Sequence, residues 1–401
     1  STARIKEVSL IGVTKFDQED LLSRLDLQST NFLSWWNKDD RYSRQVLTGD
    51  LEKIRSYYMN RGYLDFDIKN TTVSISETKK NVYIAIIIDE GNKYTFGDIK
   101  ISGKYYPLTE ESIFQNDIKT KKGEVFSREL LNQSTESINQ ELGNYGYAFS
   151  NVNPIPDVDK ENLIVGFNYF IEPGKKVYVR RISFVGNEKT KDKVLRREMR
   201  QFEASYYDKE KIDQSSRRLK RTQYFEDVDI KTVSVPGISD QVDLTVAVKE
   251  KNTGSVKLGA GASSDEGLVG SFSVTQANFL GTGNTVSATI NTSSVNTIYS
   301  ISHIDPYYTL DGISRRITAY TKETNTKDLD TGQYDKKSLG LGVGFGIPMN
   351  EYDTVNIGFD VDMSEIKLVS SSPTRYKDYC KDVSGGDDGG CDQNEAVLSV
   401  G

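Results

Sequence analysis

Three segments of this 401-residue sequence follow the same order of elements, and this internal repeat constrains the fold more than any other feature. Each segment begins with an alternating apolar stretch that ends at a glycine: IKEVSLIGV (5–13), FGDIKISGK (96–104) and VRRISFVGN (179–187). The spacing of apolar residues then predicts a short helix, a second helix and two alternating strands. The sequence therefore predicts three α+β domains of order strand, helix, helix, strand, strand, at residues 1–91, 92–174 and 175–251.

The join between the second helix and the next strand also repeats, with an aromatic residue at the start of the strand: Tyr63, Tyr147 and Tyr224. Gly62 and Gly146 are predicted to supply a left-handed cap at the end of the helix. The third segment departs from this pattern, because it has Gln223 at that position. We interpret these residues as core and cap positions without a direct functional contact.

After residue 251 the helical spacing disappears and alternating apolar stretches follow one another. LGLGVGFGI (339–347) and VNIGFDVDM (355–363) are examples, joined to other stretches by short polar turns and longer polar loops. This pattern predicts seven or eight antiparallel strands with one apolar face. A transmembrane β-barrel and a soluble β-sandwich both fit the alternation, so the residues alone leave the two open.

Composition excludes several classes of function. The formal net charge of -7 makes nucleic acid an unsuitable main partner, because phosphates are bound chiefly by concentrated Lys and Arg. The chain has a single histidine, His303, in a polar strand, which gives no convincing basis for a Ser-His-Asp arrangement or a histidine metal cluster. The acidic stretch DVSGGDDGGC contains Asp382, Asp387 and Asp388, but its spacing does not fit a calcium loop. The sequence therefore predicts a protein that is not an enzyme, with neither a metal nor a cofactor.

Longer stretches resemble a known family. WWNKDDRYSRQVLTGDLEKIRSYYMNRGYLDFDI, GNEKTKDKVLRREMRQFE, SDQVDLTVAVKEKNTGS, ANFLGTGN and DPYYTLDGIS are similar to the BamA family of outer-membrane assembly proteins, in the same order and over nearly the whole chain. The resemblance implies that the three repeats are the third, fourth and fifth POTRA domains. Residues 252–401 would then be the N-terminal half of a sixteen-stranded transmembrane barrel. We expect the full protein to be longer, with any export signal removed or outside this sequence.

The resemblance implies a partner site in the third repeat. Glu203 occupies the position of a glutamate that, in the family, engages an arginine of the lipoprotein BamD. A basic run that includes Arg196, Arg197 and Arg200 lies next to it. A charge run is usually a solvated helix face, but a run beside a membrane domain also suits an acidic partner or lipid head groups.

The first strand of the predicted barrel is unusually poor in side chains that could pack. Gly259 and Gly261 lie at its centre, and glycine weakens strand pairing. Glycines can also serve only to let a barrel wall bend, but the family resemblance favours a lateral gate. We expect the gate to consist of Ser255, Val256, Lys257, Leu258, Gly259, Ala260, Gly261 and Ala262. Cys380 and Cys391 are the two cysteines of the chain, and we expect them to form a disulfide in a surface loop exposed to an oxidising compartment.

The function implied by the resemblance is the non-enzymatic insertion of β-barrel proteins into the bacterial outer membrane. The POTRA domains would receive unfolded clients in the periplasm on their sheet edges, and the barrel would release them through its lateral seam. BAM lipoproteins, BamD in particular, outer-membrane protein clients and outer-membrane lipid are the expected partners. A related translocation factor, a two-partner secretion transporter and, more distantly, a soluble multidomain binding protein are the alternatives.

Overall fold

The computed structural model describes residues 4–27, 42–78, 81–264, 266–326, 333–351, 353–384 and 389–401. The chain divides into two compact units. The first contains residues 1–180, 203–211 and 234–242, and the second contains residues 181–202, 212–233 and 243–401. Among the residues described, no helix combines the length and the hydropathy needed to cross a bilayer.

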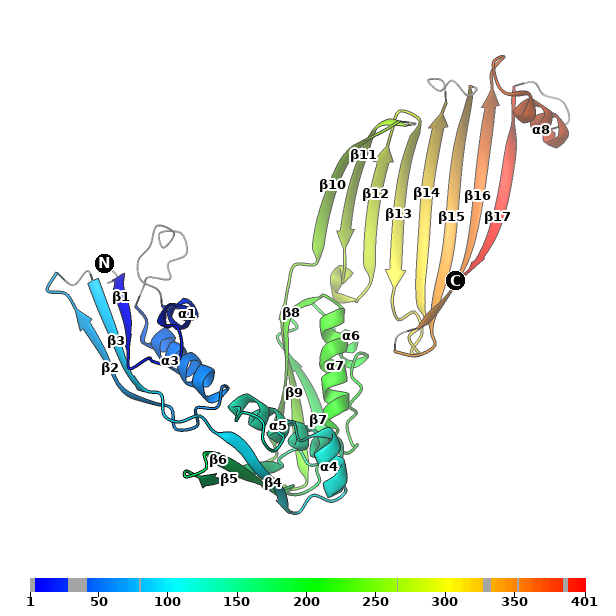
Figure 1. Cartoon of the computed structure of the whole chain (residues 1–401). Coiled ribbons are helices and arrows are strands. Elements are labelled where there is room, and N and C mark those ends of the chain that lie inside the picture. The colour runs from blue at the N-terminus through cyan, green and yellow to red at the C-terminus, as the bar shows by residue number, and fades with distance from the viewer. Residues whose placement is uncertain are drawn as a thin grey trace. The chain divides into compact units, whose positions relative to one another are not determined.

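The first repeat is a three-stranded sheet packed against two helices (Figure 1). Its elements are β1 (Arg4–Ile11), α1 (Gln18–Ser23), α3 (Arg44–Met59), β2 (Asp67–Ile75) and β3 (Asn81–Asp89). The central strand β3 runs parallel to β1 and antiparallel to β2. Because its side chains alternate, Ile84 and Ile86 point to one face, where they are buried with Ile54 and Tyr58 of α3.

The second repeat has the same arrangement. Its elements are β4 (Thr95–Gly103), α4 (Glu110–Asn116), α5 (Arg128–Asn144), β5 (Asn151–Asp159) and β6 (Ile164–Glu172). β6 is central, parallel to β4 and antiparallel to β5. Phe167 and Tyr169 of β6 share a buried core with Ile138 and Leu142 of α5.

The third repeat consists of β7 (Tyr178–Val185), α6 (Asp192–Arg196), α7 (Lys209–Arg221), β8 (Phe225–Ser234) and β9 (Gln241–Glu250). Its sheet has the order β7, β9, β8, so the last strand is again central. The predicted order of elements is thus confirmed in all three repeats.

A glycine at the end of the first strand of each repeat touches the backbone of the central strand. Gly12, Gly103 and Gly186 have φ angles of 99°, 96° and 84°, which favour glycine. A Cβ atom at these positions would lie 2.3, 2.2 and 2.0 Å from the carbonyl oxygens of Ile88, Ile171 and Val248. The glycine that marks each repeat in the sequence is therefore required by space as well as by conformation.

The helix caps also repeat, including the one that the sequence did not predict. Gly62 and Gly146 have φ angles of 104° and 100°. Gln223 has a φ of 60° and keeps the left-handed conformation without being a glycine. The departure in the third repeat is therefore one of residue type and not of backbone shape.

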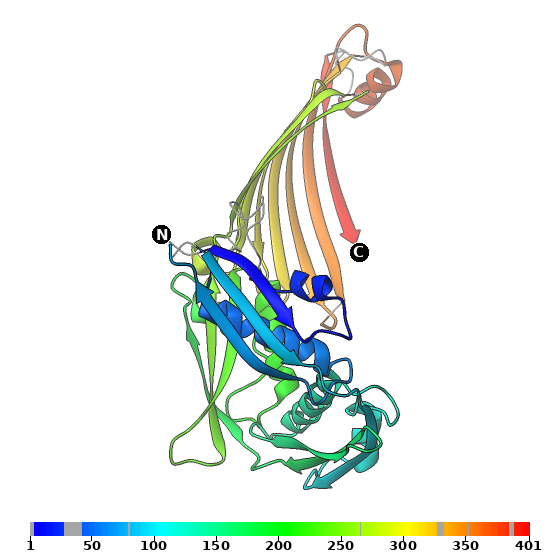
Figure 2. The same cartoon turned by 60° about the vertical axis from the view of Figure 1, so that its left-hand side comes forward.

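The rest of the described chain forms one antiparallel sheet with its strands in sequence order (Figure 1). The strands are β10 (Gly254–Ser263), β11 (Gly267–Gln276), β12 (Thr285–Thr292), β13 (Asn296–Asp305), β14 (Ser314–Asn325), β15 (Tyr334–Pro348), β16 (Thr354–Leu368) and β17 (Gly390–Val400). Figure 2 shows that this sheet curves. As described, it is a single eight-stranded sheet rather than two packed sheets, which favours half of a barrel over a sandwich.

The two faces of this sheet differ in polarity, because directly paired residues share a face. One row contains Phe272, Ile290, Tyr299, Thr321 and Leu339, which pair in turn across β11 to β15, and all of them except Thr321 are apolar. The row displaced by one residue contains polar groups such as Ser273, Thr289 and Ser300. We call the first the apolar face. Its large side chains are exposed within the described chain.

Short connections join the strands at the end of the sheet where β10 begins. Residues 277–284, 306–313 and 349–353 link β11 to β12, β13 to β14 and β15 to β16, and we call them the junction turns. Tyr352, in the last of these connections, lies outside the described residues. At the opposite end, the connection between β16 and β17 contains helix α8 (Thr374–Ser384), which the sequence did not predict.

Candidate functional site: the junction of the third repeat with the strand sheet

The loop and helices of the third repeat that belong to the second unit are held by local polar contacts. The carboxylate of Glu250, the last residue of β9, accepts hydrogen bonds from the backbone N–H groups of Lys189 (3.1 Å) and Thr190 (2.7 Å). The hydroxyl of Ser215 in α7 accepts one from the Arg200 N–H at 2.8 Å. These contacts fix the segment between β7 and α7, so its arginine side chains are presented in defined positions.

A cluster of charged side chains joins this segment to the junction turns. The Arg218 guanidinium of α7 donates to the Glu351 carboxylate at 2.6 Å and to the Tyr307 hydroxyl at 2.8 Å. It also forms an ion pair with Glu198 at 2.9 Å. Arg200 Nε donates to the other oxygen of Glu351 at 2.9 Å. Because Glu351 and Tyr307 lie in different turns, one arginine ties two junction turns to the helix.

The two carboxylates of this cluster differ in how far they are buried. The Glu198 side chain is 9% exposed, whereas that of Glu351 is 44% exposed. The hydrogen bond from Arg200, together with that from Arg218, holds the pKa of the Glu351 carboxyl below its ordinary value, although desolvation acts in the opposite direction. The Glu351 carboxylate therefore accepts both arginine hydrogen bonds as an anion near neutral pH.

Aromatic contacts extend the cluster. The Arg197 guanidinium lies over the Tyr307 ring, 4.3 Å from its centroid. It also lies so close to Gly283 that a Cβ there would be 2.2 Å from Arg197 Nη2. The Tyr224 hydroxyl donates to the Gly283 carbonyl oxygen at 2.9 Å, and burial raises the pKa of this phenol. Tyr224, interpreted from sequence as a core residue at a helix end, thus also contacts a junction turn.

The turn nearest the first strand is held in the same way. Asn278 donates through its side-chain amide to the Thr190 hydroxyl at 2.7 Å. The Lys191 N–H donates to the Gly281 carbonyl at 3.0 Å, and a Cβ on Gly281 would lie 1.9 Å from the Lys189 carbonyl oxygen. The backbones of loop and turn are therefore in direct contact.

The predicted partner-binding residues fall on two different surfaces. Arg197 and Arg200 contact the junction turns, as described. Arg196 donates to the Ile182 carbonyl at 3.2 Å and lies 5.2 Å from the Phe184 ring centroid. Glu203 is exposed in the turn that follows α6. Glu198, Tyr307 and Glu351 were not predicted as site residues. The basic run was the available signal, but the sequence did not indicate which distant turn would face it.

The predicted gate residues occupy one strand. Ser255, Val256, Lys257, Leu258, Gly259, Ala260, Gly261 and Ala262 all lie in β10. β10 is at one edge of the described sheet, and every residue along it is exposed. Its start is bound to β11, because the Thr253 hydroxyl donates to the Ala277 carbonyl at 2.6 Å.

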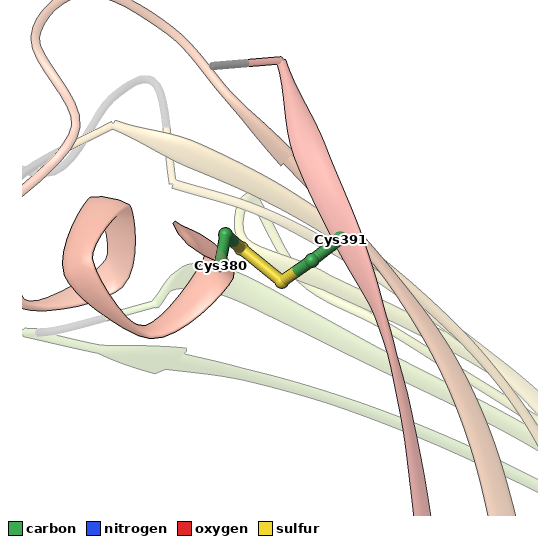
Figure 3. Close-up of a disulfide and its surroundings, with 2 residues drawn as sticks. All are labelled: Cys380 and Cys391. Atoms are coloured by element: carbon green, nitrogen blue, oxygen red, sulfur yellow. A yellow bond between two sulfur atoms is a disulfide. The ribbon is translucent and has the colours of Figure 1, made fainter. Parts of the chain in front are cut away.

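The two cysteines are joined. The sulfur atoms of Cys380 in α8 and Cys391 in β17 are 2.04 Å apart, so a disulfide ties the loop helix to the strand (Figure 3). Of the acidic residues near them, Asp382 is exposed, while Asp387 and Asp388 lie outside the described residues. Within the part of the chain that is described, no group of three or more His, Cys, Asp or Glu side chains could hold a metal ion.

Comparison with known proteins agrees with this architecture. The POTRA family model, "Surface antigen variable number repeat", matches residues 3–91, 94–174 and 177–251, and the Omp85 superfamily domain matches residues 278–399. The chain is 31% identical, over 95% of its length, to the outer membrane protein assembly factor BamA of Neisseria meningitidis, of which it covers 48%. It thus spans about half the length of the curated relatives it matches.

Solved structures show the same fold. The crystal structure of BamA from Haemophilus ducreyi lacking POTRA domains 1–3 is similar with a TM-score of 0.65 and 28% identity, covering 77% of this chain and 58% of that one. The Haemophilus influenzae BamA POTRA3-5 structure is similar with a TM-score of 0.55 and 27% identity, covering 62% of this chain and 97% of that one.

These relatives are named as assembly factors and not as enzymes, in agreement with the non-enzymatic expectation. Three POTRA matches, an Omp85 match and BamA relatives over most of the chain locate it in the bacterial outer membrane, with its POTRA repeats in the periplasm. The chain therefore belongs to the POTRA family and is BamA-like, with three POTRA repeats followed by an Omp85 superfamily domain whose eight described strands form half of a barrel.

Proposed function

We propose that the protein containing this chain assembles β-barrel proteins into the outer membrane without catalytic chemistry. The observation that carries the proposal is the position of β10, an exposed edge strand rich in glycine that follows directly on the third repeat. The names of the BamA relatives support the role of an assembly factor. In this proposal the repeats at 1–91, 92–174 and 175–251 are the third, fourth and fifth POTRA domains, and residues 252–401 begin the barrel.

Clients would first add to free sheet edges of the repeats by backbone hydrogen bonds, which need no particular sequence. The edges are not equivalent. β5 is an edge strand that contains Pro154 and Pro156, which have no N–H to donate. The edge strand β2 has no proline. A photoreactive residue at Thr72 in β2 is expected to capture unfolded client more strongly than one at Ile155 in β5, and equal capture would contradict the preference.

Insertion would then occur at β10. A client strand has to compete for the hydrogen-bonding edge of this strand, because unpaired backbone groups are costly in hydrocarbon. Weak pairing of β10 favours that exchange. Gly261 has nothing within 4 Å of a Cβ position, so no neighbouring side chain packs there.

The test uses single cysteines at positions 255–262 of the full-length protein and a stalled barrel client with a cysteine in its terminal strand. Disulfide capture is expected along β10 and absent at control positions 285–292 in β12. Capture at equal levels in both strands, or at none of the β10 positions, would exclude β10 as the gate.

We propose that Glu203 contributes to binding a BAM lipoprotein, with BamD as the partner that the family resemblance indicates. Its exposure supports this role. Arg197 and Arg200 contact the junction turns. Glu203→Lys is expected to reduce co-purification of the lipoprotein, and Glu188→Lys, an exposed glutamate of the same repeat, is the matched control. Equal co-purification of both variants would show that Glu203 has no part in docking.

A further inference from the structure

Each junction turn carries a large apolar side chain that the described chain leaves exposed. Leu280 is 77% exposed, Leu310 is 101% exposed and Met349 is 67% exposed. They belong to the three separate turns defined above, and all three turns lie at the same end of the sheet. Exposed apolar residues grouped in this way indicate a contact with another apolar phase or partner.

The turn that carries Leu280 also has a costly backbone. Asn278 and Leu280 have φ angles of 50° and 52°. Asparagine tolerates this left-handed conformation, but for a residue such as leucine it costs roughly 1–2 kcal/mol. The turn is nevertheless fixed, because Asn278 Oδ1 accepts from the Gly283 N–H at 2.9 Å and the Phe279 N–H donates to the Asn284 carbonyl at 2.7 Å. The Leu280 side chain gains little packing in return within the described chain.

The residues next to the junction turns indicate what the exposed side chains contact. The apolar face continues to these turns. Phe345 of β15 pairs with Arg315, near the beginning of β14, and with Ile357 of β16. Tyr308 of a junction turn lies 6.1 Å from Phe345 between ring centroids, and the Arg315 guanidinium lies over the Tyr308 ring at 4.1 Å. An aromatic ring paired with an arginine at the end of an apolar strand face is typical of a membrane interface.

We propose that Leu280, Leu310 and Met349 form a lipid-anchoring rim that inserts into the head-group and acyl boundary of the periplasmic leaflet. This inference rests on the proposed membrane role of the sheet, and it adds the turns to the lipid contact of the strands. The rim holds the foot of the sheet at a fixed depth. The rim includes Leu280 of the 277–284 turn, which begins beside β10, since the Ala277 N–H donates to the Thr253 carbonyl.

The rim can be tested by lipid quenching in the full-length protein. A thiol-reactive bimane would label a single introduced cysteine at 280, 310 or 349, because both cysteines of this chain are in the disulfide and any cysteine elsewhere in the full-length protein is replaced by serine. The labelled protein is reconstituted into phosphatidylethanolamine and phosphatidylglycerol vesicles with and without brominated acyl chains. Leu341→Cys on the apolar face is the positive control, and Asp311→Cys, in the same turn as Leu310, is the aqueous control.

Quenching at the three rim positions is expected to reach at least half of that at position 341 and at least three times that at position 311. Rim values equal to that at 311, with strong quenching at 341, would overturn the rim and leave the proposed function intact. Absence of quenching at 341 as well would overturn both, because the apolar face itself would not contact lipid.

Discussion

Replacing Arg218 by methionine should loosen the junction far more than replacing either of two neighbouring arginines. Methionine keeps the apolar stem of the side chain and removes its charge and hydrogen bonds. The change would leave the Glu198 carboxylate, 9% exposed, without its 2.9 Å partner. Arg197 Nε, 3.8 Å away, is the remaining charge beside it.

The expected cost follows from burial. Removing one member of a buried ion pair costs about 3–5 kcal/mol, and because Arg218 keeps some solvent contact we expect about 2–3 kcal/mol. Arg200→Met breaks a pair with the 44% exposed Glu351, and exposed pairs contribute about 0.2–1 kcal/mol. Arg217→Met, at an exposed adjacent position, should cost about 0.5 kcal/mol or less.

Hydrogen exchange measured by mass spectrometry can separate these values in the full-length protein in micelles, because it reports local opening. A cost of about 2 kcal/mol corresponds to roughly 30-fold faster exchange from the opened state. Peptides covering residues 215–224 and 345–351 should show this change in Arg218→Met and little change in Arg217→Met. Equal exchange in the two variants would refute the assignment of Arg218 as the central contact of the junction.

Three further predictions concern other parts of the chain. Gly103→Ala should destabilise the second repeat by about 2–5 kcal/mol in urea unfolding, since backbone strain and overpacking add. Gly123 is also left-handed but has no atom within 4 Å of a Cβ position, so Gly123→Ala should cost about 1–2 kcal/mol. Equal costs would refute the spatial argument. Burial would raise the pKa of the Glu90 carboxyl, but hydrogen bonds from Thr14 and Lys15 outweigh it and lower the pKa below 4.5. The first repeat should therefore lose stability as the pH falls below that value. Glu90→Gln should weaken this dependence when the free energy of unfolding is measured against pH. Gly261→Thr should strengthen β10 pairing by up to about 1 kcal/mol and slow client insertion up to about fivefold, while Gly344→Thr in β15 should leave the rate unchanged; a rate that is the same for both would count against gating by β10.

The repeats could be predicted in some detail, because their signals are local. A strand ending in a glycine, a helix stripe and a central strand such as VYIAIII each specify their own element, and neighbouring elements pack together. The cap at Gln223 was harder to predict, since residue type suggested a different backbone. Its left-handed conformation depends on the fold of the repeat and not on a glycine.

The junction could not be predicted, for a different reason. Arg218 and Glu351 are separated by 133 residues, and no periodicity relates them. The basic run indicated that something acidic would be nearby, and a partner protein or lipid was a reasonable hypothesis. Which turn would face the run depends on the length and curvature of eight strands, which sequence spacing does not determine. The helix α8 was missed because the stretch lies within a polar loop between strands.

The position of the ionic cluster has a mechanical consequence. Arg218 and Arg200 hold the turns between β13 and β14 and between β15 and β16. In the sheet order, β10 is three strands away from β13, where the first of these turns begins. A pulling force on the third repeat is therefore carried in part by the later strands, in addition to the part that reaches β10 along the chain. β10 can therefore separate from β11 and pair again while the contacts of Arg218 and Arg200 with Glu351 and Tyr307 stay formed.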